Sequence, residues 1–105
     1  MDLNISSSCQ DSLCTLAVRG EIDVANADSF REALMGLLED SQKDVVIDLT
    51  EAPYIDSTGI GVMMGAAHRA EELNRSIKLV CPHENIVRVL NMLGVDKQLT
   101  LVSKA

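Results

Sequence analysis

The segment DVVIDLTEAPYIDSTGIG, residues 44–61, decides how this chain folds. It begins with a nearly continuous aliphatic run at residues 45–49, which is typical of a central strand covered on both faces, as in parallel sheets. Pro53 ends that strand, because proline cannot donate to a ladder of hydrogen bonds. Asp56 is a favourable N-cap residue, so Ser57 is predicted to open a helix. The segment therefore predicts a buried strand, a short connection and a helix that begins with an exposed hydroxyl.

Two strands and a helix are predicted before this segment. Residues 3–8 form a first strand, and residues 13–19 form a second one in which apolar and polar side chains alternate. The turn signal at residues 10–12 predicts that the two strands form an antiparallel hairpin. Asn26 is a second N-cap candidate, and the apolar spacing after it predicts a helix that ends near residue 40.

Helices and strands continue to alternate after the segment. A helix is predicted over residues 57–74, a buried strand over residues 77–81, a helix over residues 84–93 and a final strand over residues 99–102. The order β-β-α-β-α-β-α-β implies right-handed crossovers between parallel strands. We therefore expect one α/β domain over residues 1–105, with a mixed sheet of four to five strands and three to four helices. The sheet should be parallel at its centre and antiparallel at the N-terminal hairpin.

Three glycines interrupt the helix predicted over residues 57–74, and each costs about 1 kcal/mol in a helix interior relative to alanine. Close approach of the helix to the sheet would explain them, with Gly61 and Gly65 four residues apart on one face. The other explanation is a partner whose backbone approaches the first turn of the helix. Packing is favoured for Gly65, and both explanations stay open for Gly59 and Gly61.

The charge of the chain limits its partners. The chain has 105 residues, of which 16 are acidic and 9 basic, and its formal net charge is −7. Such a field repels a phosphate backbone, and the two aromatic residues offer little surface on which bases could stack. Direct binding of nucleic acid is therefore not expected, whereas a basic protein partner is favoured.

The three cysteines are interpreted as reduced thiols. They form neither a C-x-x-C pair nor a zinc-type spacing with a histidine. Cys14 and Cys81 lie in apolar strand patterns and are assigned to the core, whereas Cys9 lies near a turn. Reduced thiols favour a cytoplasmic location, and we find no signal-peptide pattern and no apolar run of membrane-spanning length.

Ser57 is the candidate functional residue. A hydroxyl in the first turn of a helix lies beside free backbone N–H groups and the positive end of the helix dipole. Such a hydroxyl suits a nucleophile, an anion site or an acceptor of a phosphoryl group. Right-handed crossovers should also bring Asp23 to the same edge of the sheet as Ser57.

Catalysis and nucleotide binding lack supporting residues. A catalytic serine needs a general base, but His68 lies about 16 Å further along the same helix, and no G-x-S-x-G motif accompanies His83. No phosphate-binding glycine motif is present either. We therefore expect no enzymatic activity, no metal ion and no cofactor. The acidic residues of this edge are interpreted as surface or capping residues and not as magnesium ligands: Glu21, Asp23, Asp48 and Asp56.

Phosphorylation of Ser57 is the remaining option. A phosphoryl group there would add about −1.5 to −2 charges beside Asp23 and Asp56. A partner fitted to a neutral hydroxyl would then lose its fit, and no refolding would be needed.

Three pieces of the sequence together resemble a known family: Gly20-Glu-Ile-Asp-Val24, Val45-Val-Ile-Asp-Leu-Thr50 and Tyr54-Ile-Asp-Ser-Thr-Gly-Ile-Gly61. They are similar to STAS domains and, more narrowly, to bacterial anti-sigma factor antagonists of the general-stress and sporulation type. The resemblance extends over essentially the whole chain.

The resemblance implies a switch between partners. Unphosphorylated members of the family bind an anti-sigma factor that is a serine kinase, and this releases a sigma factor. The kinase uses ATP to phosphorylate the serine of the motif, here Ser57, and a PP2C-type phosphatase reverses the reaction. Thr58 is a secondary acceptor. The resemblance further implies a cytoplasmic protein that is monomeric when free, with these partner-contact residues: Glu21, Asp23, Asp56, Ser57, Thr58, Gly59, Ile60 and Gly61.

A second interpretation stays open beside the first. The chain would then be a STAS scaffold or ligand-sensing module that is not phosphorylated, as in a stressosome or a lipid-transport complex. An enzyme that uses Ser57 as its nucleophile is a third, disfavoured interpretation.

Overall fold

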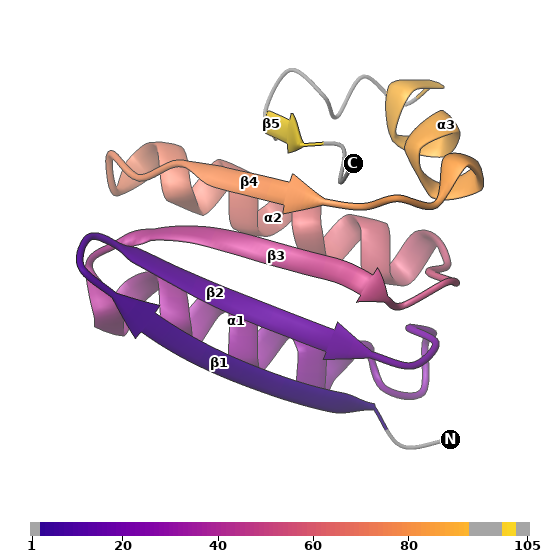
Figure 1. Cartoon of the computed structure of the whole chain (residues 1–105), viewed down its shortest axis with the longest axis horizontal. Helices are drawn as coiled ribbons and strands as arrows, with labels where there is room; N and C mark the ends of the chain where they lie inside the picture. Colours follow the sequence, from indigo (N-terminus) through magenta and orange to yellow (C-terminus); the bar gives the residue numbers. More distant parts are fainter. Residues whose placement is uncertain (1–2, 93–99, 103–105) are drawn as a thin grey trace.

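The computed structural model describes residues 3–92 and 100–102, which form one sheet with three helices (Figure 1). The sheet order is β1-β2-β3-β4-β5, with β1 antiparallel to β2 and the other neighbouring pairs parallel. These features confirm the predicted α/β fold with a mixed sheet. The strands are β1 (Asn4–Gln10), β2 (Leu13–Arg19), β3 (Asp44–Glu51), β4 (Ile77–Val80) and β5 (Thr100–Val102), and the helices are α1 (Ala27–Ser41), α2 (Ser57–Glu72) and α3 (Glu84–Met92).

The boundaries of the elements differ from the predicted ones by one or two residues. The first strand reaches Gln10 and not residue 8, so a two-residue turn connects it to β2. The helix α2 ends at Glu72 and not at residue 74. The predicted end of the third helix at residue 93 and the predicted start of the last strand at residue 99 lie outside the described residues.

The hydrophobic core lies on one face of the sheet. Val45, Ile47 and Leu49 of β3 are fully buried, whereas the residues between them are only half-buried. Both α1 and α2 lie behind the sheet in Figure 1, so no helix of this pair covers the front face. The prediction that β3 is covered on both faces is therefore wrong. The apolar run suggested burial on both faces of β3. The strand instead alternates between buried and half-buried residues, and Asp48 and Thr50 lie on its open face.

The two long helices pack side by side against this face. Phe30, Leu34 and Leu38 of α1 are fully buried, and burial of one such side chain stabilises a fold by roughly 1.5–3 kcal/mol. Outside the core, Arg69 of α2 forms an ion pair of 2.9 Å with Glu39 of α1. This hydrogen-bonded contact raises the pKa of Arg69. Within the described residues, no helix is long and apolar enough to cross a membrane.

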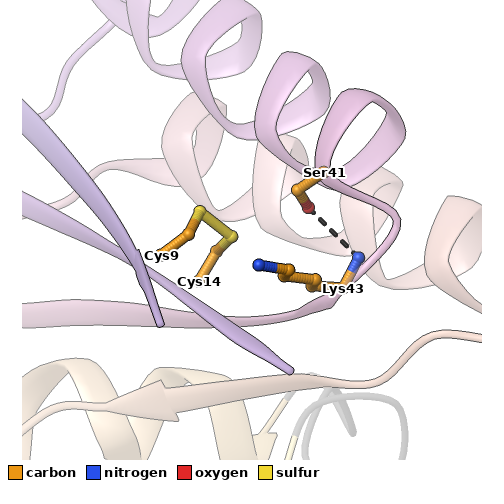
Figure 2. The surroundings of a disulfide bond; sticks show 4 residues. All are labelled: Cys9, Cys14, Ser41 and Lys43. Carbon is orange, nitrogen blue, oxygen red and sulfur yellow. Dashed lines mark hydrogen bonds between the residues drawn. A yellow bond between two sulfur atoms is a disulfide. The ribbon is translucent and has the colours of Figure 1, made fainter. Parts of the chain in front are cut away.

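The interpretation of all three cysteines as reduced thiols is wrong. Cys9 of β1 and Cys14 of β2 are joined by a disulfide bond (Figure 2). The two-residue turn at residues 11–12 explains why, because it places Cys9 directly opposite Cys14 in the hairpin register. Cys14 and Cys81 are buried as predicted, and burial raises the pKa of the free Cys81 thiol.

The three glycines of α2 have different surroundings. A Cβ atom on Gly59 would lie 2.5 Å from Cγ1 of Ile55 and 2.7 Å from Cγ2 of Ile22, so the helix approaches the sheet connections closely there. A Cβ atom on Gly61 would meet no atom within 4 Å. Gly65 is exposed, and a Cβ atom there would only touch Met35 at 3.8 Å. Packing therefore explains Gly59 and does not explain Gly61, the two positions at which both explanations were open, and the packing explanation that was favoured for Gly65 is wrong.

Gly59→Ala should lower the free energy of unfolding by about 1–3 kcal/mol, because the added methyl group overlaps two buried isoleucines. Gly61→Ala is the matched control. It should raise the free energy of unfolding by up to about 1 kcal/mol, because its methyl group enters open space and alanine favours the helix. Urea denaturation of both variants measures the difference, and equal effects would contradict the close approach at Gly59.

Candidate functional site

The first turn of α2 presents Ser57 to solvent. Asp56 has an extended backbone, with φ −91° and ψ −177°, and its Oδ1 accepts hydrogen bonds from the backbone N–H groups of Thr58 at 3.0 Å and Gly59 at 3.1 Å. Asp56 is therefore the N-cap, as predicted, and Ser57 is the first residue of the helix. Its side chain is exposed, next to the positive end of the helix dipole.

Backbone hydrogen bonds join the connection after β2 to the connection after β3. Ile22 and Ile55 form a parallel bridge, in which the N–H of Ile22 donates to the carbonyl of Tyr54 at 3.0 Å. The N–H of Asp56 donates in turn to the carbonyl of Ile22 at 3.0 Å. Asp23 follows Ile22 directly in the chain. The bridge therefore brings Asp23 to the edge that carries Ser57, as the crossover argument predicts.

Asn26 shapes the connection that carries Asp23. It precedes α1 as predicted, but its side chain caps no N–H group of that helix. Its Oδ1 accepts from the backbone N–H of Asp23 at 2.9 Å, and its Nδ2 donates to the carbonyl of Glu21 at 2.8 Å. Asp23 accepts from the N–H of Ala25 at 2.9 Å. The side chain of Asn26 therefore stabilises the loop at residues 21–26 and does not cap the helix.

The predicted partner-contact residues divide by burial. Glu21, Ser57 and Gly61 are exposed, and the three residues that are half-buried are Asp23, Asp56 and Thr58. Gly59 and Ile60 are buried, with only 4% of Ile60 exposed. These two residues pack against the core, so little of either is available for direct contact with a partner.

Two exposed apolar side chains were missed by sequence reasoning. Val24, directly after Asp23, is 75% exposed, and Tyr54, two residues before Asp56, is 48% exposed. The available signal in the sequence was an apolar side chain next to polar residues of the site, Val24 after Asp23 and Tyr54 shortly before Asp56. Because the bridge between Ile22 and Ile55 holds the two connections together, these side chains belong to the same edge as Ser57.

The two histidines do not complete a catalytic arrangement. The Nε2 atom of His83 lies 3.1 Å from the carbonyl oxygen of Leu49 and 3.1 Å from that of Thr50. Both partners are acceptors, so Nε2 carries the proton and donates, which fastens the connection after β4 to the end of β3. His68 is exposed near the middle of α2.

The acidic residues serve local structure. The carboxylate of Asp48 accepts from the backbone N–H of Thr50 at 2.9 Å and also from its hydroxyl. Asp56 is occupied as the N-cap. Among the residues that the structure describes, no three histidine, cysteine, aspartate or glutamate side chains are grouped so that they could hold a metal ion.

The fold and this edge define a family. Residues 4–104 match the model of the STAS domain family, and the chain belongs to that family. The anti-sigma-B factor antagonist of Staphylococcus aureus is 27% identical to this chain over 95 residues, which cover 90% of this chain and 88% of the relative.

Solved structures agree with this assignment at the level of the fold. A crystal structure of an anti-sigma factor antagonist from Mycobacterium paratuberculosis superposes with a TM-score of 0.78 at 22% identity, and the match covers 95% of this chain and 85% of the other. The Bacillus cell fate determinant SpoIIAA in its phosphorylated form superposes with a TM-score of 0.73 at 14% identity, covering 96% and 93%.

Asp56→Ala should lower the free energy of unfolding by about 1 kcal/mol, because it removes the acceptor for two N–H groups of the first turn. Asp56→Asn keeps an acceptor oxygen and should change the free energy of unfolding by only a few tenths of a kcal/mol. Amide hydrogen exchange should show the loss at Thr58 and Gly59 in the alanine variant. If both variants lost the same stability, the charge and not the cap would be responsible.

Proposed function

We propose that this STAS domain is an anti-sigma factor antagonist that binds an anti-sigma factor with serine kinase activity while Ser57 is unphosphorylated. Phosphorylation of Ser57 ends the binding. The exposed Ser57 hydroxyl at the capped N-terminus of α2 is the observation that carries this proposal. A kinase can reach it without any opening of the domain.

Ser57 is the better phosphate acceptor of the two hydroxyls in the first turn. Thr58 is half-buried, and its backbone N–H is held by Asp56, whereas Ser57 is exposed. We keep Thr58 as a secondary acceptor. The helix dipole stabilises a phosphoryl group at Ser57 by about 0.3–1 kcal/mol, which offsets part of its repulsion from Asp23 and Asp56.

The phosphoryl group changes the charge of the edge without moving the backbone. It adds about −1.5 to −2 charges to a surface that already has Glu21, Asp23 and Asp56. A partner that accepts the hydroxyl in a close contact then meets both a larger group and additional negative charge. Like-charge contacts across an interface cost several kcal/mol, which is enough to release a partner.

The edge also indicates the chemistry of the partner's surface. Val24 and Tyr54 offer apolar contacts, and the carboxylates beside them favour basic residues on the partner. The exposed Gly61 leaves room for a backbone to approach the second turn of α2. The remaining proposed contact residues are Glu21, Asp23, Asp56, Ser57 and Thr58.

The comparisons support this function. The Staphylococcus aureus relative is an anti-sigma-B factor antagonist, and SpoIIAA has been solved in a phosphorylated form. Reversal of the modification by a PP2C-type phosphatase completes the proposed cycle. A STAS scaffold or ligand-sensing module that is never phosphorylated is the alternative outcome of the experiment below.

The experiment uses the proposed partner, a cognate serine kinase anti-sigma factor. With ATP it should add one phosphoryl group to the wild-type chain and none to Ser57→Ala, which should still bind the kinase. Ser57→Asp should bind at least about a hundredfold more weakly, because it places a carboxylate at the contact. Isothermal titration and mass mapping of the phosphorylated chain provide the two readouts.

A control separates the position of the added charge from the change in net charge. Ser12→Asp adds the same charge in the exposed hairpin turn, at the opposite end of β2 from the site, and should leave the affinity unchanged. Equal binding by Ser57→Asp and the wild-type chain would refute the switch. Phosphorylation of Ser57→Ala to the wild-type extent would move the acceptor to Thr58 or beyond.

Val24→Ser should weaken binding to the same kinase by about tenfold, because it removes an exposed apolar contact beside Ser57. Val89→Ser is the matched control, since Val89 of α3 is also partly exposed, at 40%, but lies outside the two joined connections. The two affinities are compared by titration. If the two variants bound equally well, the edge would not extend to Val24.

A further inference from the structure

The β1–β2 hairpin brings two cysteines together by its register. Gln10 pairs with Leu13 across the two-residue turn, so Cys9 pairs with Cys14 as the next rung. Their Cα atoms lie 4.0 Å apart, which corresponds to the closer of the two kinds of antiparallel pair. The strand pairing therefore places the two side chains within bonding range of each other.

The two sulfur atoms differ in access. Cys9 lies on the edge strand and is exposed, whereas Cys14 is fully buried in the core. An incoming thiolate therefore has access to Cys9 but not to Cys14. Exposed disulfides are the ones that exchange with thiols, whereas buried disulfides resist reduction.

A cation lies beside this disulfide. Leu13 pairs with Asp44, so Lys43, the residue before Asp44, reaches the turn end of the hairpin. Figure 2 shows the half-buried Lys43 side chain extending toward the disulfide. Its backbone N–H donates to Oγ of Ser41 at 3.2 Å, which fixes the connection.

The neighbouring carboxylate of Asp44 forms no ion pair with Lys43. Asp44 accepts a hydrogen bond from the backbone N–H of Ser76 at 3.0 Å. None of the ion pairs found among residues 3–92 involves Lys43. Its ammonium group is therefore available to stabilise a thiolate that forms at Cys14.

We propose that Cys9 and Cys14 form a thiol–disulfide exchange site for low-molecular-weight thiols. An incoming thiolate attacks the sulfur of Cys9, forms a mixed disulfide with it and breaks the bond to Cys14. Cys14 leaves as a thiolate, which the Lys43 ammonium stabilises. In the reverse step this thiolate attacks the mixed disulfide, restores the bond between Cys9 and Cys14 and releases the small thiolate, so each step is a balanced exchange.

This site is separate from the proposed phosphorylation site. The hairpin turn and the N-terminus of α2 lie at opposite ends of the sheet in Figure 1. The disulfide links the edge strand β1 to β2, so the exchange changes how firmly these two strands are held together. Its success or failure does not depend on what Ser57 does.

The test mixes the oxidised full-length chain with reduced glutathione, quenches by acid and locates the adducts by mass mapping. The native chain should gain one glutathione at Cys9 and none at Cys14 or at the buried Cys81. Lys43→Gln should slow the exchange by about fivefold, because the leaving thiolate loses its cation. Lys78→Gln, which removes the charge of an exposed lysine on β4, is the matched control and should exchange at the wild-type rate.

A second pair of variants tests the roles of the two sulfurs. Cys14→Ala should keep a stable mixed disulfide at Cys9 when it is treated with oxidised glutathione, because the resolving thiol is gone. Cys9→Ser should take up none, because its remaining thiols are buried. Glutathione on Cys14, equal rates for the two lysine variants, or a wild-type chain that exchanges only in denaturant would overturn the proposal.

Discussion

The parallel bridge between Ile22 and Ile55 holds together the two connections that build the candidate functional edge. Two backbone hydrogen bonds of 3.0 Å form it, and they join Ile22 to Tyr54 and Asp56 to Ile22. Gly59 packs beneath it, because only a residue without a Cβ atom allows α2 to begin so close to both isoleucines. Without this bridge, Asp23 would have no fixed position relative to Ser57. A parallel sheet alone brings strand ends to one edge, and the bridge sets the positions of individual residues there.

The electrostatics of the edge follow from that geometry. Two of its acidic groups have structural tasks, since Asp56 caps α2 and Asp23 closes a turn with Ala25. The same groups leave a negative surface around a neutral hydroxyl, with the exposed Val24 and Tyr54 beside it. Such a surface is altered strongly by one phosphoryl group, because the added charge meets carboxylates that the fold cannot move away. Under the proposed function, a rigid edge of this kind would let the domain release its partner without refolding.

Much of this arrangement was predictable from local sequence signals, and the rest depended on contacts distant in the chain. The cap at Asp56, the exposed Ser57 and the approach of Asp23 followed from N-cap chemistry and crossover handedness. The roles of Gly59 and Gly61 could not be separated by sequence, because the difference between them lies in what Ile22 and Ile55 place beside the helix. The bond between Cys9 and Cys14 was missed because the predicted first strand ended at residue 8, and two more residues of pairing set the register. The open face of β3 was missed because hydrophobicity does not say on which side the helices lie.

The central claim is that a phosphoryl group on Ser57 changes this edge while the fold stays the same. Amide NMR spectra of the labelled chain, recorded before and after phosphorylation of Ser57 by the proposed kinase partner, test it most directly. The account predicts shifts confined to residues 21–27 and 54–62, with the remaining amides of the described chain unchanged. Shifts that spread through β4 and α3, or loss of the native peak pattern, would show refolding and contradict the account.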